Sequence, residues 1–332
     1  MMPHAAILLW LCLMATATLS HADESAWRNF MAAATDAAKR GDQSAAAANY
    51  ENAVKAAAAF AGTDTRLAAA LFGLGRAKRA QHDNAAAENS YLRALAILDA
   101  SPKASDAARA EIYNALGDVS RVQGRHKPAE DYYQRELAQL AKLHGADSAA
   151  VATALSNNMA SLYRAQGRHD EAEAAYLRAL GILEKGVPSG DERLGIALID
   201  LAEWFQGRQQ YAKAEPYYRR GIPILQKVFP PAHPRILSLL QEWGQVRQLQ
   251  GHYTEAEAVY RAMLALIETH RGADHPNAAV ALNNLIGLYE AQGRLADADA
   301  LRQRMLQIAN TPYRGQPYVP YQGNPKPPRA AW

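Results

Sequence analysis

A pattern of apolar and polar positions recurs along this chain, and each copy predicts two helices joined by a tight turn. One copy is YRAQGRHDEAEAAYLRAL, Tyr163 to Leu180, with its turn at Gly167. Seven copies align on the turn residues Gly41, His82, Gly124, Gly167, Gln209, Gly251 and Gly293, with spacings of 41, 42, 43, 42, 42 and 42 residues. One period sustained over the chain predicts an all-α solenoid, in which each unit buries its apolar face against its neighbours.

The second helix of each unit carries an alanine five residues after the turn and, in six units, a tyrosine nine residues after it. The alanines are Ala46, Ala87, Ala129, Ala172, Ala214, Ala256 and Ala298; the tyrosines are Tyr50, Tyr91, Tyr133, Tyr176, Tyr218 and Tyr260, with Arg302 in the last unit. A spacing of four places both residues on one face of a helix. We expect the alanine to admit a neighbouring helix and the aromatic ring to fill the gap beside it.

The first helix of six units carries a small residue seven positions before the turn. These residues are Ala34, Gly75, Gly117, Ala160, Ala202 and Gly244. A larger side chain there would hold the paired helices apart. Four residues depart from the repeat pattern. His82 and Gln209 replace the turn glycine, and Glu136 and Met263 stand at a position of the second helix where a small residue is usual.

This combination of positions resembles the tetratricopeptide repeat, and its 42-residue period is similar to that of the kinesin-light-chain-like subtype. The resemblance covers residues 26–310 and implies a right-handed superhelical solenoid of about seven helix-turn-helix repeats within a domain of residues 23–310. The expected repeats span approximately residues 26–64, 66–105, 107–148, 150–191, 192–233, 234–275 and 276–310.

The first 22 residues predict a secretory signal peptide. They contain no Asp, Glu, Lys or Arg, and their apolar run from Ala5 to Leu19 is shorter than a bilayer span. We expect cleavage after Ala22, and so a periplasmic or secreted protein with no later membrane span; retention of the segment as an anchor is the alternative. The sole cysteine, Cys12, lies in this segment, so stability must come from packing rather than disulfides.

Residues 311–332 have a different composition, TPYRGQPYVPYQGNPKPPRAAW, which is rich in Pro, Tyr and Gly and has no helical period. This composition predicts a disordered or polyproline-like tail. A disordered spacer is one hypothesis, and a tail that lies in the protein's own groove and inhibits it is the other.

Composition and motifs give no indication of chemistry. A formal charge of +3 on 332 residues, without a basic stripe, gives no reason to expect a nucleic-acid partner. No metalloprotease, phosphate-loop or nucleophile-elbow motif is present in the sequence. The linker histidines His144, His233 and His275 belong to separate units and cannot converge on one ion. We therefore expect no enzyme, cofactor or metal site.

The resemblance implies a concave groove lined by the first helix of each repeat. The groove positions expected to bind a peptide are Arg76, Arg79, Asn114, Asp118, Arg121, Asn157, Asn158, Ser161, Arg164, Gln241, Gln245, Asn283 and Asn284. Further groove positions are Asp200, Glu203, Gln206, Glu242, Gln248 and Glu290. Arg79, Arg121 and Arg164 share one repeat position and could grip a carboxylate bidentately. The sequence thus predicts a basic groove early in the array and a neutral or acidic one late.

The function expected from these features is that of an exported, non-catalytic scaffold or adaptor that binds a protein or extended peptide segment in its groove. The alternative is a structural or assembly component of a cell-envelope complex that associates with itself through its convex face and linkers. The sequence leaves the oligomeric state open.

Overall fold

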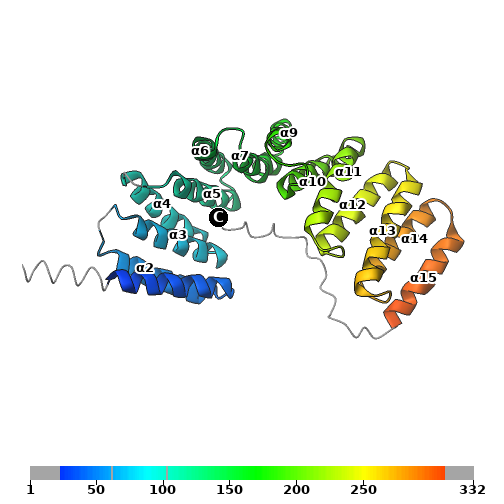
Figure 1. Cartoon of the computed structure of the whole chain (residues 1–332), viewed down its shortest axis with the longest axis horizontal. Helices are drawn as coiled ribbons and strands as arrows, with labels where there is room; N and C mark the ends of the chain where they lie inside the picture. Colours follow the sequence, from blue (N-terminus) through cyan, green and yellow to red (C-terminus); the bar gives the residue numbers. More distant parts are fainter. Residues whose placement is uncertain (1–22, 61–62, 102–103, 311–332) are drawn as a thin grey trace, which may run out of the picture. The chain divides into compact units, whose positions relative to one another are not determined.

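The computed structural model describes residues 23–60, 63–101 and 104–310, and all regular structure in these residues is helical (Figure 1). The all-α repeat fold predicted from the sequence is therefore confirmed. The expected signal segment 1–22 and tail 311–332 lie outside the described residues. The chain divides into two compact units, Met1–Ala175 and Tyr176–Trp332, and each is considered by itself below.

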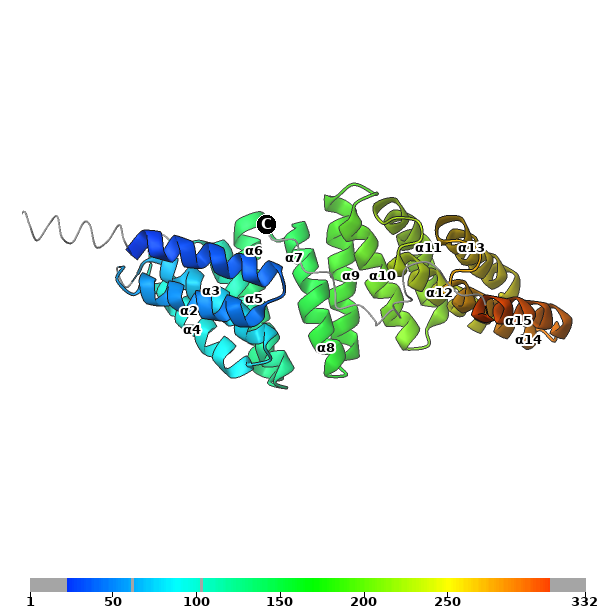
Figure 2. The ribbon, with the colours of Figure 1, turned by 90° about the horizontal axis from the view of Figure 1, so that it is seen from below.

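Unit 1 is a succession of helices that pack against their neighbours along the chain (Figure 2). Residues 23–39 are helical. They are followed by α2 (Gln43–Ala57), α3 (Thr65–Ala80), α4 (Asn84–Ala100), α5 (Asp106–Val122), α6 (His126–His144), α7 (Ala149–Ala154), the π-helix η1 (Leu155–Ala160) and α8 (Ser161–Ala165). The helix α9 (His169–Gly186) begins in unit 1 and continues into unit 2.

Unit 2 repeats the same helical hairpins. After α9 it contains α10 (Glu192–Gly207), α11 (Tyr211–Val228), α12 (Pro234–Leu249), α13 (Tyr253–Arg271), α14 (Ala278–Ala291) and α15 (Leu295–Asn310). The hairpins α10–α11, α12–α13 and α14–α15 each pack internally, and α11 and α13 also pack against the helix that follows. No helix in the described residues is long and apolar enough to cross a membrane.

The turn inside each hairpin has a left-handed backbone. All seven turn residues have positive φ, including His82 at 64° and Gln209 at 60°. Glycine adopts this conformation without steric penalty, whereas residues with a Cβ pay for it. The two departures from glycine therefore leave the turn geometry intact and place local strain at His82 and Gln209.

The small residue of the first helix makes room for the tyrosine of the second helix in the same hairpin. A Cβ added to Gly75 would lie 2.4 Å from the ring of Tyr91, and one added to Gly244 would lie 2.3 Å from the ring of Tyr260. Both tyrosine side chains are buried. The expected pairing of a small residue with an aromatic ring is thus a direct contact, and it sets how closely the two helices approach.

Neighbouring hairpins are also joined by ionic contacts. In unit 1, Nη1 of Arg168 lies 2.6 Å from Oε2 of Glu130, and the Tyr163 hydroxyl donates to Oε1 of Glu130 at 3.1 Å. In unit 2, Arg294 and Tyr289 contact Glu257 in the same way. The guanidinium groups also lie over the tyrosine rings, at 4.3 Å from the Tyr163 centroid in the first case. We call each Glu–Arg–Tyr group an inter-repeat clamp.

Candidate partner-binding faces

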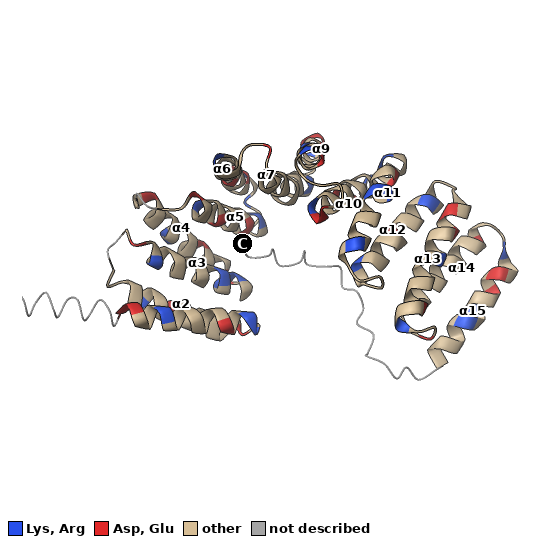
Figure 3. Ribbon diagram, viewed as in Figure 1, with Lys and Arg blue, Asp and Glu red and all other residues tan. Residues whose placement is uncertain are grey.

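The predicted groove residues of unit 1 lie on the first helices of its hairpins. Arg76 and Arg79 lie on α3, and Asn114, Asp118 and Arg121 lie on α5. The π-helix η1 carries Asn157 and Asn158, and α8 carries Ser161 and Arg164. Figure 3 shows the acidic and basic positions along these helices. We call the exposed surface formed by Arg76, Arg79, Arg121 and Arg164 the basic face.

Asp118 is the acidic centre of the basic face. Nη1 of Arg79 lies 2.7 Å from Oδ2 of Asp118, which joins α3 to α5. The buried hydroxyl of Tyr133 donates to Oδ1 of the same carboxylate at 2.9 Å, and Nε of Arg121 donates to the Tyr133 oxygen at 3.4 Å. Two of the three arginines that share a repeat position are therefore already engaged within the protein.

Burial and the Asp118 carboxylate shift the pKa of Tyr133 in the same direction and the pKa of Arg79 in opposite directions. Burial raises the pKa of the Tyr133 hydroxyl, and the Asp118 carboxylate raises it further. Burial disfavours the charged form of Arg79, but the adjacent Asp118 carboxylate keeps the pKa of Arg79 above its ordinary value. The tyrosine is thus a neutral donor and the arginine a permanent cation at neutral pH.

Arg76 and Arg164 differ from these arginines. Both side chains are exposed, and neither makes a hydrogen bond or an ion pair with any residue in the described part of the chain. Ser161, three residues before Arg164, is half-buried. The unpaired guanidinium groups can therefore accept an external carboxylate without first losing an internal one.

The two asparagines near the middle of unit 1 contact a buried glutamate that the groove prediction did not include. Nδ2 of Asn114 donates to both carboxylate oxygens of Glu136 at 3.1 Å, and Nδ2 of Asn158 donates to Oε2 at 2.6 Å. Glu136 and Asn158 are each only 4% exposed. The expectation that Asn158 lines an accessible groove is therefore wrong, because its amide is buried and serves Glu136.

The predicted residues of unit 2 lie on α12 and α14. Gln245 and Asn283 are exposed, while Gln241 and Asn284 are half-buried. Nδ2 of Asn284 is buried and has no hydrogen-bond partner among the described residues. None of these four side chains carries a charge, so this part of the surface offers amide donors and acceptors only.

Acidic side chains come together elsewhere in unit 2. Burial raises the pKa of Glu203 on α10, Arg235 partly offsets this effect at an Nη2–Oε1 distance of 2.8 Å, and Glu242 and Asp200 raise the pKa further. The carboxylate of Glu242 accepts hydrogen bonds from Ser238 at 2.9 Å and from Tyr218 at 3.2 Å. Unit 2 thus has half-buried carboxylates on α10 and α12, and the change from a basic to a neutral or acidic groove along the array stays a prediction.

The repeat position that includes Arg121 contacts the second helix of the same hairpin in four of the repeats. Its partner twelve residues later is a tyrosine in three described contacts and an arginine in the fourth. The pairs are Arg121 with Tyr133, Gln206 with Tyr218, Gln248 with Tyr260, and Glu290 with Arg302. Where arginine replaces tyrosine on the second helix, glutamate replaces the neutral or basic residue on the first.

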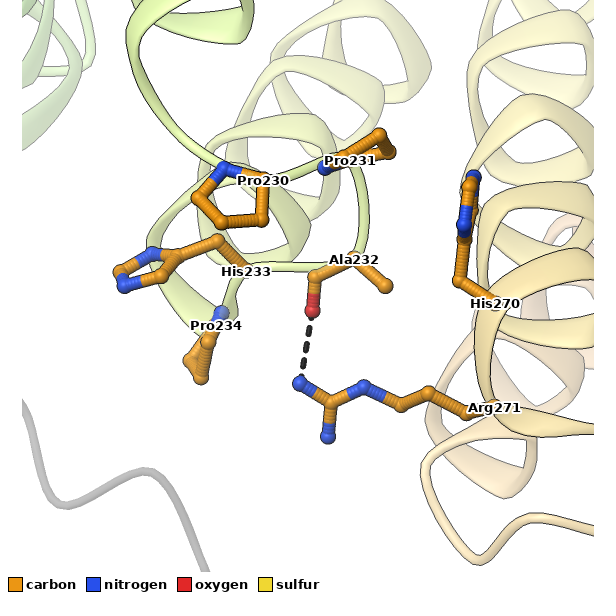
Figure 4. A pocket seen from close by; sticks show the side chains of 7 residues that line it. All are labelled: Pro230, Pro231, Ala232, His233, Pro234, His270 and Arg271. Atoms are coloured by element: carbon orange, nitrogen blue, oxygen red, sulfur yellow. Dashed lines mark hydrogen bonds between the residues drawn. The ribbon is translucent and has the colours of Figure 1, made fainter.

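A shallow pocket of about 340 Å³ lies in unit 2, away from the predicted groove residues (Figure 4). It is lined by Pro230, Pro231, Ala232, His233, Pro234, His270 and Arg271. Nη2 of Arg271 donates to the Ala232 carbonyl oxygen at 2.7 Å and so links α13 to the segment between α11 and α12. In the described residues, no group of three or more His, Cys, Asp or Glu side chains is arranged to hold a metal ion.

Comparisons with solved structures give the same fold. The chain is similar to BtubC (BKLC) from P. vanneervenii, with a TM-score of 0.55, 22% identity, and coverage of 70% of this chain and 94% of the other. It is similar to a putative kinesin light chain of Podosopora anserina with nearly identical TPR-like repeats, with a TM-score of 0.53, 20% identity, and coverage of 62% and 98%. The apo form of RapI aligns with a TM-score of 0.57 at 15% identity, covering 85% and 97%.

No curated protein matches the sequence. The sequence profile of the Tetratricopeptide repeat matches residues 108–185, 151–227 and 235–311, which together make up more than half of the chain. Members of this family generally act as protein-interaction scaffolds. The resemblance that the turn, alanine and tyrosine positions indicated is therefore confirmed, and the chain belongs to the tetratricopeptide repeat family.

Proposed function

We propose that this protein is a non-catalytic scaffold whose basic face binds an acidic segment of a partner protein or peptide. The observation that carries the proposal is the pair of exposed arginines, Arg76 and Arg164, which make no ion pair within the described residues and belong to the same basic face as the Arg79–Asp118–Arg121 network. Four guanidinium groups and the half-buried Asp118 carboxylate make up this surface. A segment that carries carboxylates would neutralise this excess, and arginine favours bidentate contacts with carboxylates.

Binding of a labelled acidic peptide tests the proposal. The probe is a fluorescein-labelled hexaglutamate, compared with hexalysine, and the protein is the full chain after the predicted signal segment. Replacing Arg76 and Arg164 with alanine should weaken binding of hexaglutamate by about five- to tenfold, since each exposed ionic contact contributes up to about 1 kcal/mol. Thermal stability should change little, because neither side chain makes a hydrogen bond or an ion pair in the part of the chain that the structure describes.

The matched control is the double substitution Arg93→Ala and Lys127→Ala. These residues are exposed on the second helices α4 and α6 and make no ion pair in the described ranges. Their replacement changes the net charge by the same amount. Equal weakening by both double variants would show that only net charge matters and would contradict a specific basic face.

Export is a separate part of the proposal. The charge-free apolar segment before Ala22 supports translocation of the chain into the periplasm or the medium. Expression of the full sequence in a Gram-negative host, followed by fractionation and intact-mass measurement, tests this point. A mass corresponding to a chain that begins at Asp23 in the exported fraction is expected, and a cytoplasmic chain of full mass would overturn it.

A second candidate function is assembly through self-association. It is favoured by exposed apolar side chains beside the hairpin turns, where Leu249 is 53% and Leu295 is 60% exposed. Light scattering would distinguish the two: a mass above the monomer that falls on replacement of both leucines with serine favours assembly. Under the first proposal, the same substitutions leave hexaglutamate binding unchanged.

A further inference from the structure

The first helix of the fourth repeat differs from those of its neighbours. It is interrupted by the π-helix Leu155–Ala160, whereas α3, α5, α10, α12 and α14 are each continuous α-helices. The turn-to-turn spacing that contains it, from Gly124 to Gly167, is 43 residues, one more than the 42 of most repeats. A single residue inserted into an α-helix is accommodated as a short π-turn.

The position of the extra residue follows from comparison with α14. Counting forward from the Gly-Ala-Asp linkers, Leu155 aligns with Leu282; counting back from the turn glycines, Ser156 aligns with it. Leu155 and Ser156 are each 5% exposed, and Leu282 is fully buried. The count places the extra residue between the linker and the turn, and the π-helix narrows this to Leu155–Ala160, where two consecutive buried residues align with the single Leu282; we assign the insertion to Ser156, the polar residue of the two.

An unusual residue stands on the helix that packs against this π-helix. Twelve residues after the turn, where α6 carries the acidic Glu136, the other second helices carry only uncharged residues: Ala53, Ala94, Ala179, Gly221, Met263 and Met305. The helix α6 contacts α7, η1 and α8. The carboxylate of Glu136 receives hydrogen bonds from Asn158 of η1 and from Asn114 of α5, so it links both first helices of adjacent repeats.

We infer that Ser156 and Glu136 are a compensating pair: the insertion shifts the helix register so that Asn158 turns inward, and the buried Glu136 carboxylate holds it there. The insertion and Glu136 act together through the hydrogen bond between the Asn158 amide and the Glu136 carboxylate. Without Glu136, the buried Asn158 amide would lose its acceptor, which destabilises the π-helix. Glu136 is thus a positioning residue that fixes the register of α8.

This register has a consequence for binding, which rests on the function proposed above. Ser161 and Arg164 follow the π-helix on α8, so their direction on the basic face depends on the inserted residue. An α-helix turns about 100° per residue, because it has 3.6 residues per turn. Removal of the insertion therefore rotates the residues before η1 relative to Arg164 by about one residue step.

Amide hydrogen exchange tests the inference without any ligand. Four full-length proteins are compared: the wild type, a variant lacking Ser156, Glu136→Ala, and the combination. In the wild type, residues 155–160 should exchange faster than residues 281–286 of α14, which serve as the internal reference. Glu136→Ala alone should accelerate exchange in residues 155–160 by about tenfold, as expected for loss of a buried charged acceptor. In the combined variant, exchange should return to the rate of the reference.

The two changes should therefore be strongly non-additive. Additive effects on exchange, or persistence of fast exchange after deletion of Ser156, would overturn the inference. If the deletion variant does not fold, Asn158→Ala is used in its place. Combined with Glu136→Ala, it should change the exchange rate little beyond either single substitution. Fully additive effects on exchange would contradict the contact between Asn158 and Glu136. Hexaglutamate binding is measured in parallel, and Glu136→Ala should weaken it while Glu136→Gln retains part of it. If the wild type binds no hexaglutamate, the proposed function fails while the exchange result still decides this inference.

Discussion

The hydroxyl group of Tyr289 donates a hydrogen bond of 2.8 Å to Oε1 of Glu257, and this contact ties α14 to α13. Arg294 completes the inter-repeat clamp at 2.8 Å from Oε2 of the same carboxylate. Each repeat buries its apolar face only against its neighbours, so such contacts between hairpins determine whether the array unfolds as a unit. The clamps recur because the glutamate, arginine and tyrosine positions recur in phase.

The Glu257 clamp makes stability depend on pH. Burial raises the pKa of Glu257, but hydrogen bonds from Tyr289, Arg261 and Arg294 outweigh this effect and lower the pKa to about 2. A carboxyl group with a lowered pKa in the folded state contributes stability that is present above its ordinary pKa and is lost as the pH falls through the folded value. Glu257→Gln should therefore cost about 1–2 kcal/mol at pH 7, and the difference from the wild type should shrink between about pH 4.5 and 2.

Urea unfolding at a series of pH values measures this effect. The exposed Asp274 in the same unit makes no hydrogen bond or ion pair in the described residues, so Asp274→Asn is the control. A Glu257→Gln difference that stays constant down to pH 2 would contradict the clamp.

Gly244→Ala should destabilise unit 2. The added Cβ would lie 2.3 Å from the buried ring of Tyr260, so the helices must separate or the ring must move, at a cost of about 1–3 kcal/mol. Gly287→Ala on α14 is the matched control, because nothing lies within 4 Å of its added Cβ. Since alanine is the better helix former, this control should gain about 0.5–1 kcal/mol. Equal melting temperatures for the two variants would refute the contact.

Substitution with glycine should stabilise a turn that lacks it. Gln209 has φ of 60°, and glycine relieves the steric penalty of this conformation at the cost of a more flexible unfolded chain. We expect Gln209→Gly to raise the unfolding free energy by about 0.5–1 kcal/mol and Gly251→Gln to lower it by about 1 kcal/mol. Calorimetry on both variants provides the check, and a loss of stability in Gln209→Gly would show that the glutamine side chain contributes a contact of its own.

Asp118→Ala should strengthen binding of an acidic peptide while it weakens the fold. Its removal frees Arg79 and Arg121 for an external carboxylate and deprives Tyr133 of its acceptor. Hexaglutamate binding should tighten by about three- to tenfold at low salt, and stability should fall by about 1 kcal/mol. Titrations at low and high salt separate the electrostatic part of the gain. Weaker binding at low salt would place the peptide elsewhere.

The repeat and its packing can be predicted from the sequence, because both depend on the spacing of nearby residues. The turn position, the alanine and the tyrosine recur at intervals that a helix converts directly into faces, and the glycines opposite Tyr91 and Tyr260 follow from the same count. The 43-residue spacing was visible in the sequence, but spacing alone does not reveal whether an extra residue enters a linker or a helix.

The amino-acid sequence by itself determined the all-α repeat, its seven turns and the set of polar residues on the first helices, since periodicity dictates which positions share a face. Only the tertiary structure decided which of those residues are available. Asp118 forms an ion pair with Arg79 of a neighbouring hairpin, and Glu136 accepts a hydrogen bond from the buried Asn158. These contacts join residues that are 39 and 22 positions apart, so local spacing does not reveal them. Contacts between residues so far apart in the sequence depend on how the helices pack. A buried carboxylate is stable only when hydrogen-bond donors surround it, and the donors come from the helices that pack beside it.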